Sequence, residues 1–207
     1  MTSVKNIAVF VSGGGTNLQA LINSEITNGK ISLVLSSDPD AYALKRAEKA
    51  QIETVVCKKD KDMTLSEYDK LLINTLKNHN IDLVVLAGFM SILGSSFTNE
   101  YKNRIINVHP SLIPSFCGKG YYGLKVHEEV IKYGAKVTGA TVHFVNEIPD
   151  GGAIILQKAV EVMMDDTPES LQKRVMEQAE WIILPKAVSL FCSDRIEINE
   201  YGRTVIK

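Results

Sequence analysis

The fold of this chain is decided by residues 7–17, Ile7-Ala-Val-Phe-Val11-Ser-Gly-Gly-Gly-Thr-Asn17. Five consecutive apolar residues are typical of a strand buried on both faces of a parallel sheet. The glycines end this run in a tight turn, and a helix is predicted from about Asn17. A buried strand, a glycine turn and a helix together form the first half of a βαβ unit.

The same alternation continues outward from this stretch. Apolar strands are predicted at 31–35, 53–57, 82–87 and 105–109, with helices at 43–50 and 65–77. Alternating strands and helices imply right-handed crossovers, so the predicted class is α/β: one Rossmann-like domain whose mostly parallel sheet carries helices on both faces. Ligands of such sheets bind beyond the carboxyl ends of the strands, where we expect the functional residues.

The second half of the chain begins with a segment of no regular period, residues 110–123, which holds two prolines, three glycines and three aromatic residues. We expect it to form a loop over the site. The elements predicted after it are a helix at 124–133, strands at 137–145 and 153–160, a long helix from Thr167 towards Leu190 interrupted by Pro185, and a terminal hairpin at 195–206.

Composition limits the classes of function. The 207 residues are 45% hydrophobic, with 24 acidic and 23 basic side chains and a net charge of -1, which suits one compact domain with small-molecule partners and no nucleic-acid or membrane surface. Three cysteines (Cys57, Cys117 and Cys192) without CxxC spacing disfavour a disulfide framework or a zinc site. A reducing cytoplasm is the expected location.

The turn after the first strand has the composition of an anion site. Glycine allows close backbone approach, and the free amides of a helix start favour phosphate, so Gly14, Gly15, Thr16 and Asn17 are candidate phosphate ligands. The turn is not a Walker loop, and Leu18 stands where a dinucleotide fingerprint needs its third glycine. The alternative interpretation is a tight turn in which Thr16 only caps the helix.

The strand at 105–109 ends in a candidate catalytic pair. Side chains alternate along a strand, so Asn107 and His109 project from the same side, and Pro110 stops the ladder. Two such donors can stabilise the oxyanion of an acyl transfer. Asp150, in a Pro-Asp-Gly-Gly turn, could reach the imidazole and hold it in the charged form. A lone histidine at a strand end is, however, more often a structural residue.

A third segment, Leu86-Ala-Gly-Phe-Met-Ser-Ile-Leu93, leads from an apolar strand into an apolar loop. It could line the pocket of a flat aromatic ligand, although such a segment is more often plain core. Of the remaining histidines, His143 is expected either to be structural or to support the catalytic residues without touching the substrate. His79 and His127 lie in helical surroundings and carry no special signal.

Four motifs together make the chain resemble the folate-dependent glycinamide ribonucleotide formyltransferases over its whole length. They are Val11-Ser-Gly-Gly-Gly-Thr-Asn-Leu-Gln19, Leu86-Ala-Gly-Phe-Met90, Asn107-Val-His-Pro-Ser-Leu-Ile-Pro114 and His143-Phe-Val-Asn-Glu-Ile-Pro-Asp-Gly-Gly152. The resemblance implies the formyltransferase fold and three groups of site residues: a catalytic trio of Asn107, His109 and Asp150; acceptor-binding Gly14, Gly15, Thr16, Asn17 and Glu180; and folate-binding Met90, Ser91, Ile92, Leu93, Asn146, Glu147 and Asp150.

The resemblance also implies the reaction. The formyl group of 10-formyltetrahydrofolate, the co-substrate, would pass to the amine of glycinamide ribonucleotide in purine synthesis without a metal. Residues 1–105 would form the phosphate-binding half of the single domain, and residues 106–207 the folate-binding and catalytic half. A monomer and a homodimer are equally admissible. Ser91 stands where many relatives carry arginine, which leaves recognition of the folate's glutamate tail open.

Four other functions compete with this interpretation. Methionyl-tRNA formyltransferase would need a further tRNA-binding domain and a more basic surface, and formyltetrahydrofolate hydrolase an extra N-terminal regulatory domain. A dinucleotide-dependent oxidoreductase would need the glycine that Leu18 replaces. A non-catalytic nucleotide-binding module would need only the phosphate site.

Overall fold

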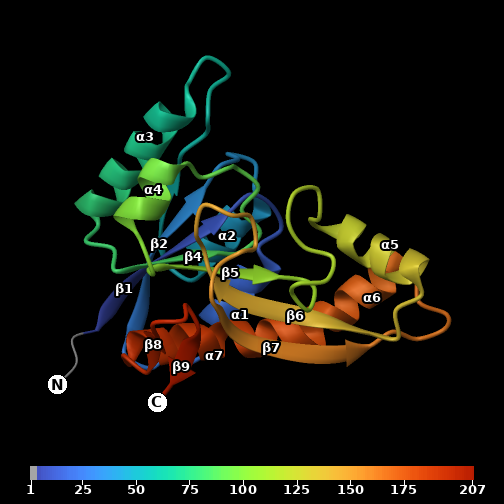
Figure 1. Ribbon diagram of the computed structural model, residues 1–207. Coiled ribbons are helices and arrows are strands. Elements are labelled where there is room, and N and C mark those ends of the chain that lie inside the picture. Colours follow the sequence, from blue (N-terminus) through green and yellow to red (C-terminus); the bar gives the residue numbers. More distant parts are fainter. Residues whose placement is uncertain (1–3) are drawn as a thin grey trace.

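The computed structural model describes residues 4–207. Its centre is one seven-stranded sheet with the order β3-β2-β1-β4-β5-β6-β7 (Figure 1). The first five of these strands run parallel, and β6 and β7 continue the sheet in antiparallel fashion. The strands are β1 (Lys5–Val11), β2 (Gly29–Ser36), β3 (Glu53–Val56), β4 (Leu83–Leu86), β5 (Ile105–His109), β6 (Val137–Phe144) and β7 (Ile154–Glu161).

Helices cover both faces of this sheet, which confirms the predicted α/β class. They are α1 (Thr16–Ile22), α2 (Tyr42–Lys49), α3 (Leu65–Asn78), α4 (Ser95–Glu100), α5 (Leu124–Tyr133), α6 (Pro168–Val175), the π-helical turn η1 (Met176–Glu180) and α7 (Trp181–Cys192). A small hairpin of β8 (Ile196–Ile198) and β9 (Thr204–Ile206) ends the chain, as predicted. No helix among residues 4–207 is long and apolar enough to cross a membrane.

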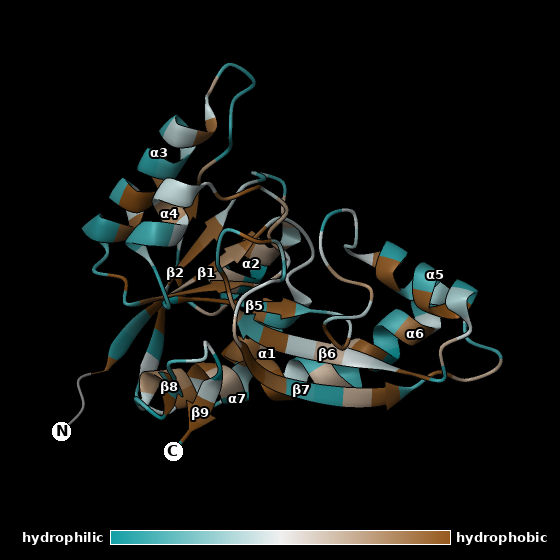
Figure 2. Cartoon of the chain, viewed as in Figure 1, coloured by the Kyte–Doolittle hydropathy of each residue, from teal (hydrophilic) through white to brown (hydrophobic). Residues whose placement is uncertain are grey.

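Alternation along β1 divides the core into two layers. Ile7, Val9 and Val11 join the apolar side chains of α1, α2 and α7 on one face, whereas Ala8 and Phe10 join those of α3 and α4 on the other. Figure 2 shows the inner strands as the most hydrophobic part of the chain. Because every residue of such a strand is buried, its sequence is continuously apolar rather than alternating.

Helix α4 was not predicted, and its stability comes from a distant side chain. Its sequence, Ser-Ser-Phe-Thr-Asn-Glu, has little intrinsic helix preference. The buried carboxylate of Asp69, on α3, accepts hydrogen bonds from the backbone amides of Gly94 (2.8 Å) and Phe97 (3.2 Å). These amides belong to the helix start, where no intrahelical acceptor exists. The cap of α4 is therefore supplied by a residue of another helix, which is why the sequence of residues 95–100 alone does not predict it.

The long C-terminal helix begins at the predicted residue, but its irregular turn lies at 176–180 and not at the predicted position. Thr167 caps α6 in a capping box with Ser170. The predicted interruption at Pro185 is wrong, because Pro185 lies inside α7 and the irregularity is the π-turn at 176–180. A π-turn widens the helix locally, and such turns recur at functional sites. Here the widened turn contains Glu180, which is buried.

The order of the strands determines where a ligand can bind. The connections from β1 and from β4 leave towards opposite faces of the sheet, so a crevice opens between the carboxyl ends of these neighbouring strands. The hydroxyl of Ser12, after β1, accepts a hydrogen bond of 2.8 Å from the amide of Met90, after β4. The glycine turn and the loop at 88–93 are thereby joined at the crevice.

Candidate active site

A cavity of about 290 Å³ lies beyond the carboxyl ends of β1, β4 and β5. Six residues proposed from sequence line it, although they come from segments far apart along the chain: Asn17, Met90, Asn107, His109, Asp150 and Glu180. We call this cavity the switch-point cavity. The other lining residues include Tyr121 and Tyr122 of the loop at 110–123, which confirms that this loop lies over the site.

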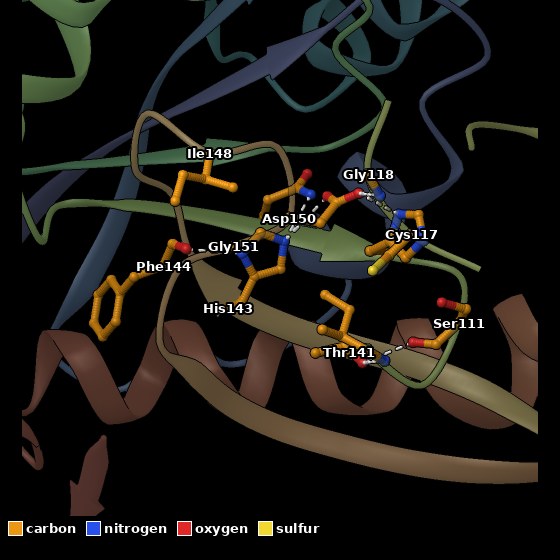
Figure 3. A network of polar contacts seen from close by, with 12 residues as sticks. Ser111, Cys117, Gly118, Thr141, His143, Phe144, Ile148, Asp150 and Gly151 are labelled. Carbon is orange, nitrogen blue, oxygen red and sulfur yellow. Dashed lines mark hydrogen bonds and ion pairs between the residues drawn. The ribbon is translucent and has the colours of Figure 1, made fainter. Parts of the chain in front are cut away.

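Asp150 lies between the imidazoles of His109 and His143. Figure 3 shows its carboxylate beside the ring of His143 and close to Gly118. Its carboxylate oxygens are 3.5 Å from Nδ1 of His109 and 3.5 Å from Nε2 of His143, and the Gly118 amide donates to it at 2.8 Å. Burial acts to raise the pKa of Asp150, but the interactions with His143, His109 and the Gly118 amide together hold it below its ordinary value. The group is therefore a carboxylate at neutral pH.

Asn107 is oriented by His143, its direct partner across the β5–β6 ladder. The Nδ1 atom of His143 lies 2.7 Å from the carbonyl of Phe144, which can only accept, so this nitrogen carries the proton. The Nε2 atom lies 3.1 Å from the Asn107 side-chain amide and 3.5 Å from the Asp150 carboxylate, and it thereby fixes the orientation of that amide. An N–H group of Asn107 remains available to the cavity that Asn107 lines.

His109 is held at both ring nitrogens. Its Nε2 atom donates to the carbonyl of Phe116 at 2.8 Å, and its Nδ1 atom faces Asp150. Burial lowers the pKa of His109, and the attraction of Asp150 does not outweigh that effect. This direction opposes the predicted charged resting form, since sequence spacing indicated the carboxylate but not the depth of the ring.

The glycine turn and Glu180 meet at Asn17. The Asn17 amide donates to the Glu180 carboxylate at 2.6 Å, and complete burial raises the pKa of Glu180 to about 7. Gly15 is the N-cap residue of α1, with a φ of 71° that favours glycine. The alternative in which Thr16 caps the helix is wrong, because Thr16 lies inside α1 and its hydroxyl contacts the sulfur of Met176 at 3.6 Å.

The residues proposed for folate binding do not all reach this cavity. Met90 lines it, whereas Asn146 and Glu147 line a second cavity of about 390 Å³ between α4 and the β6–β7 turn. Leu93 packs partly buried against α3 and α4, and Ile92 is 76% exposed. Ser91, Ile92 and Leu93 line neither cavity, and Gly14, Gly15 and Thr16 line neither.

Two further histidines belong to the site. His143, expected to be structural or to support the catalytic residues, contacts both Asn107 and Asp150. Its place on the strand antiparallel to β5 was the available signal. His127 was given no role, but it is fully buried and lines the switch-point cavity. Its position three residues before Val130, on the buried face of α5, was the only signal in the sequence.

Within residues 4–207, no group of three or more histidine, cysteine, aspartate or glutamate side chains is arranged to hold a metal ion. Cys57 and Cys192 are buried free thiols and Cys117 is a partly exposed one.

These features define an α/β protein with a polar cavity at the switch point of its sheet, and comparison with known proteins gives its family directly. The formyl transferase family model matches residues 5–188, so the chain belongs to the formyl transferase family. It is 40% identical to the phosphoribosylglycinamide formyltransferase of Haemophilus influenzae, covering 95% of this chain and 92% of that protein.

Two further relatives match almost the whole of this chain. The crystal structure of phosphoribosylglycinamide formyltransferase from Anaplasma phagocytophilum superposes with a TM-score of 0.89 at 38% identity, over 98% of this chain and 94% of that one. The trifunctional purine biosynthetic protein adenosine-3 of Gallus gallus is 40% identical over 98% of this chain. The chain spans only 20% of the length of that protein.

Proposed function

We propose that this chain transfers the formyl group of 10-formyltetrahydrofolate to the primary amine of glycinamide ribonucleotide, giving formylglycinamide ribonucleotide and tetrahydrofolate in purine synthesis. The observation that carries this proposal is the convergence of Asn107, His109 and Asp150 on the cavity that also holds Asn17 and Glu180. An oxyanion site and a nucleotide site would then share one space, as a direct transfer between two substrates requires.

In the proposed reaction the amine attacks the formyl carbon, and negative charge develops on the formyl oxygen. The free hydrogen of the Asn107 amide and the His109 ring are the donors for that oxygen. The Nε2–H group of His109 is engaged by the carbonyl of Phe116. His109 can donate to the formyl oxygen only after this hydrogen bond breaks, so binding of the substrates would require a shift of the loop at 110–123.

Asp150 is the group proposed to move the proton. As a carboxylate beside His109 it can accept a proton from the attacking amine, directly or through a water, and return it to the departing folate nitrogen. Contact with Asp150 and with the developing oxyanion would raise the proton affinity of His109, so that the ring takes up a proton from solvent and holds the oxygen as an imidazolium. Positioned proton transfer of this kind typically contributes about a hundred- to ten-thousand-fold in rate.

The proposed binding residues follow the two substrates. The turn from Gly14 to Asn17 would hold the phosphate of the acceptor, and Glu180 would hold its ribose. Residues 1–105 would thus form the phosphate-binding half of the domain, and residues 106–207 the folate-binding and catalytic half. The folate pterin would lie between the loop at 90–93 and the turn at 146–150. All of these groups come from one chain, so both a monomer and a homodimer are compatible with this mechanism. The free cysteines favour a reducing compartment such as the cytoplasm as the location of the protein.

The test is a transfer assay with defined acceptors. The purified chain is mixed with 10-formyltetrahydrofolate, and tetrahydrofolate is followed with glycinamide ribonucleotide, with methionyl-tRNA and with no acceptor. Release that depends on glycinamide ribonucleotide is the expected result. Release without an acceptor would assign hydrolysis instead, release with methionyl-tRNA would assign that substrate, and no release at all would leave only a binding module.

A further inference from the structure

His127 is a fully buried imidazole with no hydrogen-bond partner at either ring nitrogen within residues 4–207. It lies on α5 and forms part of the wall of the switch-point cavity. Leaving a buried polar group unpaired costs free energy, so such a group in a native protein requires an explanation. The mechanism proposed above does not use this residue.

The unpaired polar atoms gather at this cavity. Five buried side-chain atoms within residues 4–207 lack a partner, and three of them belong to two cavity-lining residues, Asn17 and His127. Asn17 contributes its Oδ1 atom from α1, and His127 contributes both ring nitrogens from α5. Two different helices thus contribute to the wall of one cavity a residue with unsatisfied polar atoms, which is the pattern expected of a site that a polar ligand completes.

The protonation state of the ring restricts the ligand. Burial lowers the pKa of His127 to about 4, and the nearby His109 acts in the same direction. The ring is therefore neutral at pH 7, with one donor and one acceptor. A neutral imidazole pairs well with a group that both donates and accepts, such as an amide or a hydroxyl, and gives a phosphate no charge to bind.

We propose that His127 is a substrate-binding residue that hydrogen-bonds an amide or hydroxyl group of the amine acceptor. The acceptor is favoured over the folate because His127 shares its cavity with Asn17 and Glu180. Of the seven residues proposed for folate binding, only Met90 and Asp150 line this cavity, and the other five lie outside it. This inference rests on the proposed function, since it names a contact of the same acceptor.

The test compares His127→Leu and His127→Gln with the wild-type chain in the transfer assay. His127→Leu should raise the KM for glycinamide ribonucleotide by about ten- to a hundred-fold, the loss expected for a buried hydrogen bond. The KM for 10-formyltetrahydrofolate should stay within about two-fold, and His127→Gln should recover part of the loss. His79→Leu, at the end of α3, is the matched control and should keep both constants.

Stability separates binding from a structural role. Because the ring has no partner in the protein, His127→Leu should leave the Tm unchanged or raise it while acceptor binding weakens. A normal acceptor KM, or a lowered Tm with both KM values changed equally, would overturn the inference.

A second measurement on the unmodified chain decides the question even if the leucine variant fails to fold. The ring nitrogens of His127 are observed by NMR after labelling with ¹⁵N-histidine, before and after addition of glycinamide ribonucleotide. We expect their shifts to change on addition of the acceptor and not on addition of folate alone, and unchanged shifts would refute the contact. Wild-type turnover is measured first, so failure of the proposed function appears as no turnover in any variant.

Discussion

At the scale of single residues, the site works through pairs that fix one another. Asp150 is shared between His109 and His143, and His143 in turn fixes the amide of Asn107. Of these four residues, the asparagine, the first histidine and the aspartate could be predicted from strand alternation and turn composition. The role of His143 could not, because it depends on which residue of β6 lies opposite Asn107.

Glu180 should make the stability of the chain depend on pH. Burial raises its pKa to about 7, whereas the unfolded chain releases this proton near the ordinary value of 4.5. The folded state therefore holds more protons between pH 4.5 and 7, and its stability falls as pH rises through that window. Glu180→Gln removes the effect, so the variant should gain up to about 1.4 kcal/mol relative to wild type for each pH unit crossed.

The measurement is denaturant unfolding of both proteins between pH 5 and 8. The difference in unfolding free energy should increase up to about pH 7 and then level off. Parallel curves over the whole range would show that Glu180 is already charged in the folded protein.

Arg46 should control the shape of the glycine turn. Its Nε atom donates to the carbonyl of Gly14 at 2.8 Å, and its Nη1 atom donates to the side chain of Gln19 at 3.0 Å. Without these bonds the turn loses the geometry that presents its amides. We expect Arg46→Met to raise the acceptor KM roughly ten-fold, with kcat within about two-fold. Steady-state kinetics beside the exposed control Lys49→Met would check this, and an equal fall in kcat would contradict a role in positioning alone.

At the scale of elements, the loop at 110–123 is the part that the proposed mechanism requires to change during turnover. Its Phe116 carbonyl and Gly118 amide engage His109 and Asp150 directly. The composition of this segment predicted a loop over the site, because prolines and glycines interrupt every regular period. Its contacts with the catalytic residues could not be predicted, since they join backbone groups to side chains of β5 and of the β6–β7 turn.

Helix α4 supplies a prediction about stability. Asp69→Ala would leave the amides of Gly94 and Phe97 without their acceptor. A hydrogen bond to a charged group contributes roughly 1.5–3 kcal/mol, so we expect the free energy of unfolding to fall by at least that amount. The midpoint of thermal unfolding should fall by several degrees, whereas the exposed control Asp62→Ala should leave it unchanged. An unaltered midpoint would mean that α4 does not depend on Asp69.

At the scale of the whole molecule, one run of strands and helices produces both the fold and the location of the site. The alternation of buried strands with helices was sufficient to predict the parallel sheet and the end at which ligands bind. It was not sufficient to predict the contents of the cavity. His127 and Glu180 enter it from α5 and from a π-turn. Glu180 was expected there only from the family resemblance, and nothing in the local sequence of His127 distinguishes it from an ordinary helical position.

The most direct test of the proposed chemistry is the single-turnover rate of formyl transfer to glycinamide ribonucleotide by Asn107→Ala and Asp150→Asn, with the exposed Asn78→Ala as control. If Asn107 supplies an oxyanion donor, its removal should lower the rate on the order of a hundred- to a thousand-fold while the Tm stays within a few degrees. Asp150→Asn should lose most of the rate through loss of the proton carrier. Near-normal rates in both folded variants would contradict the assignment of this cavity as the catalytic site.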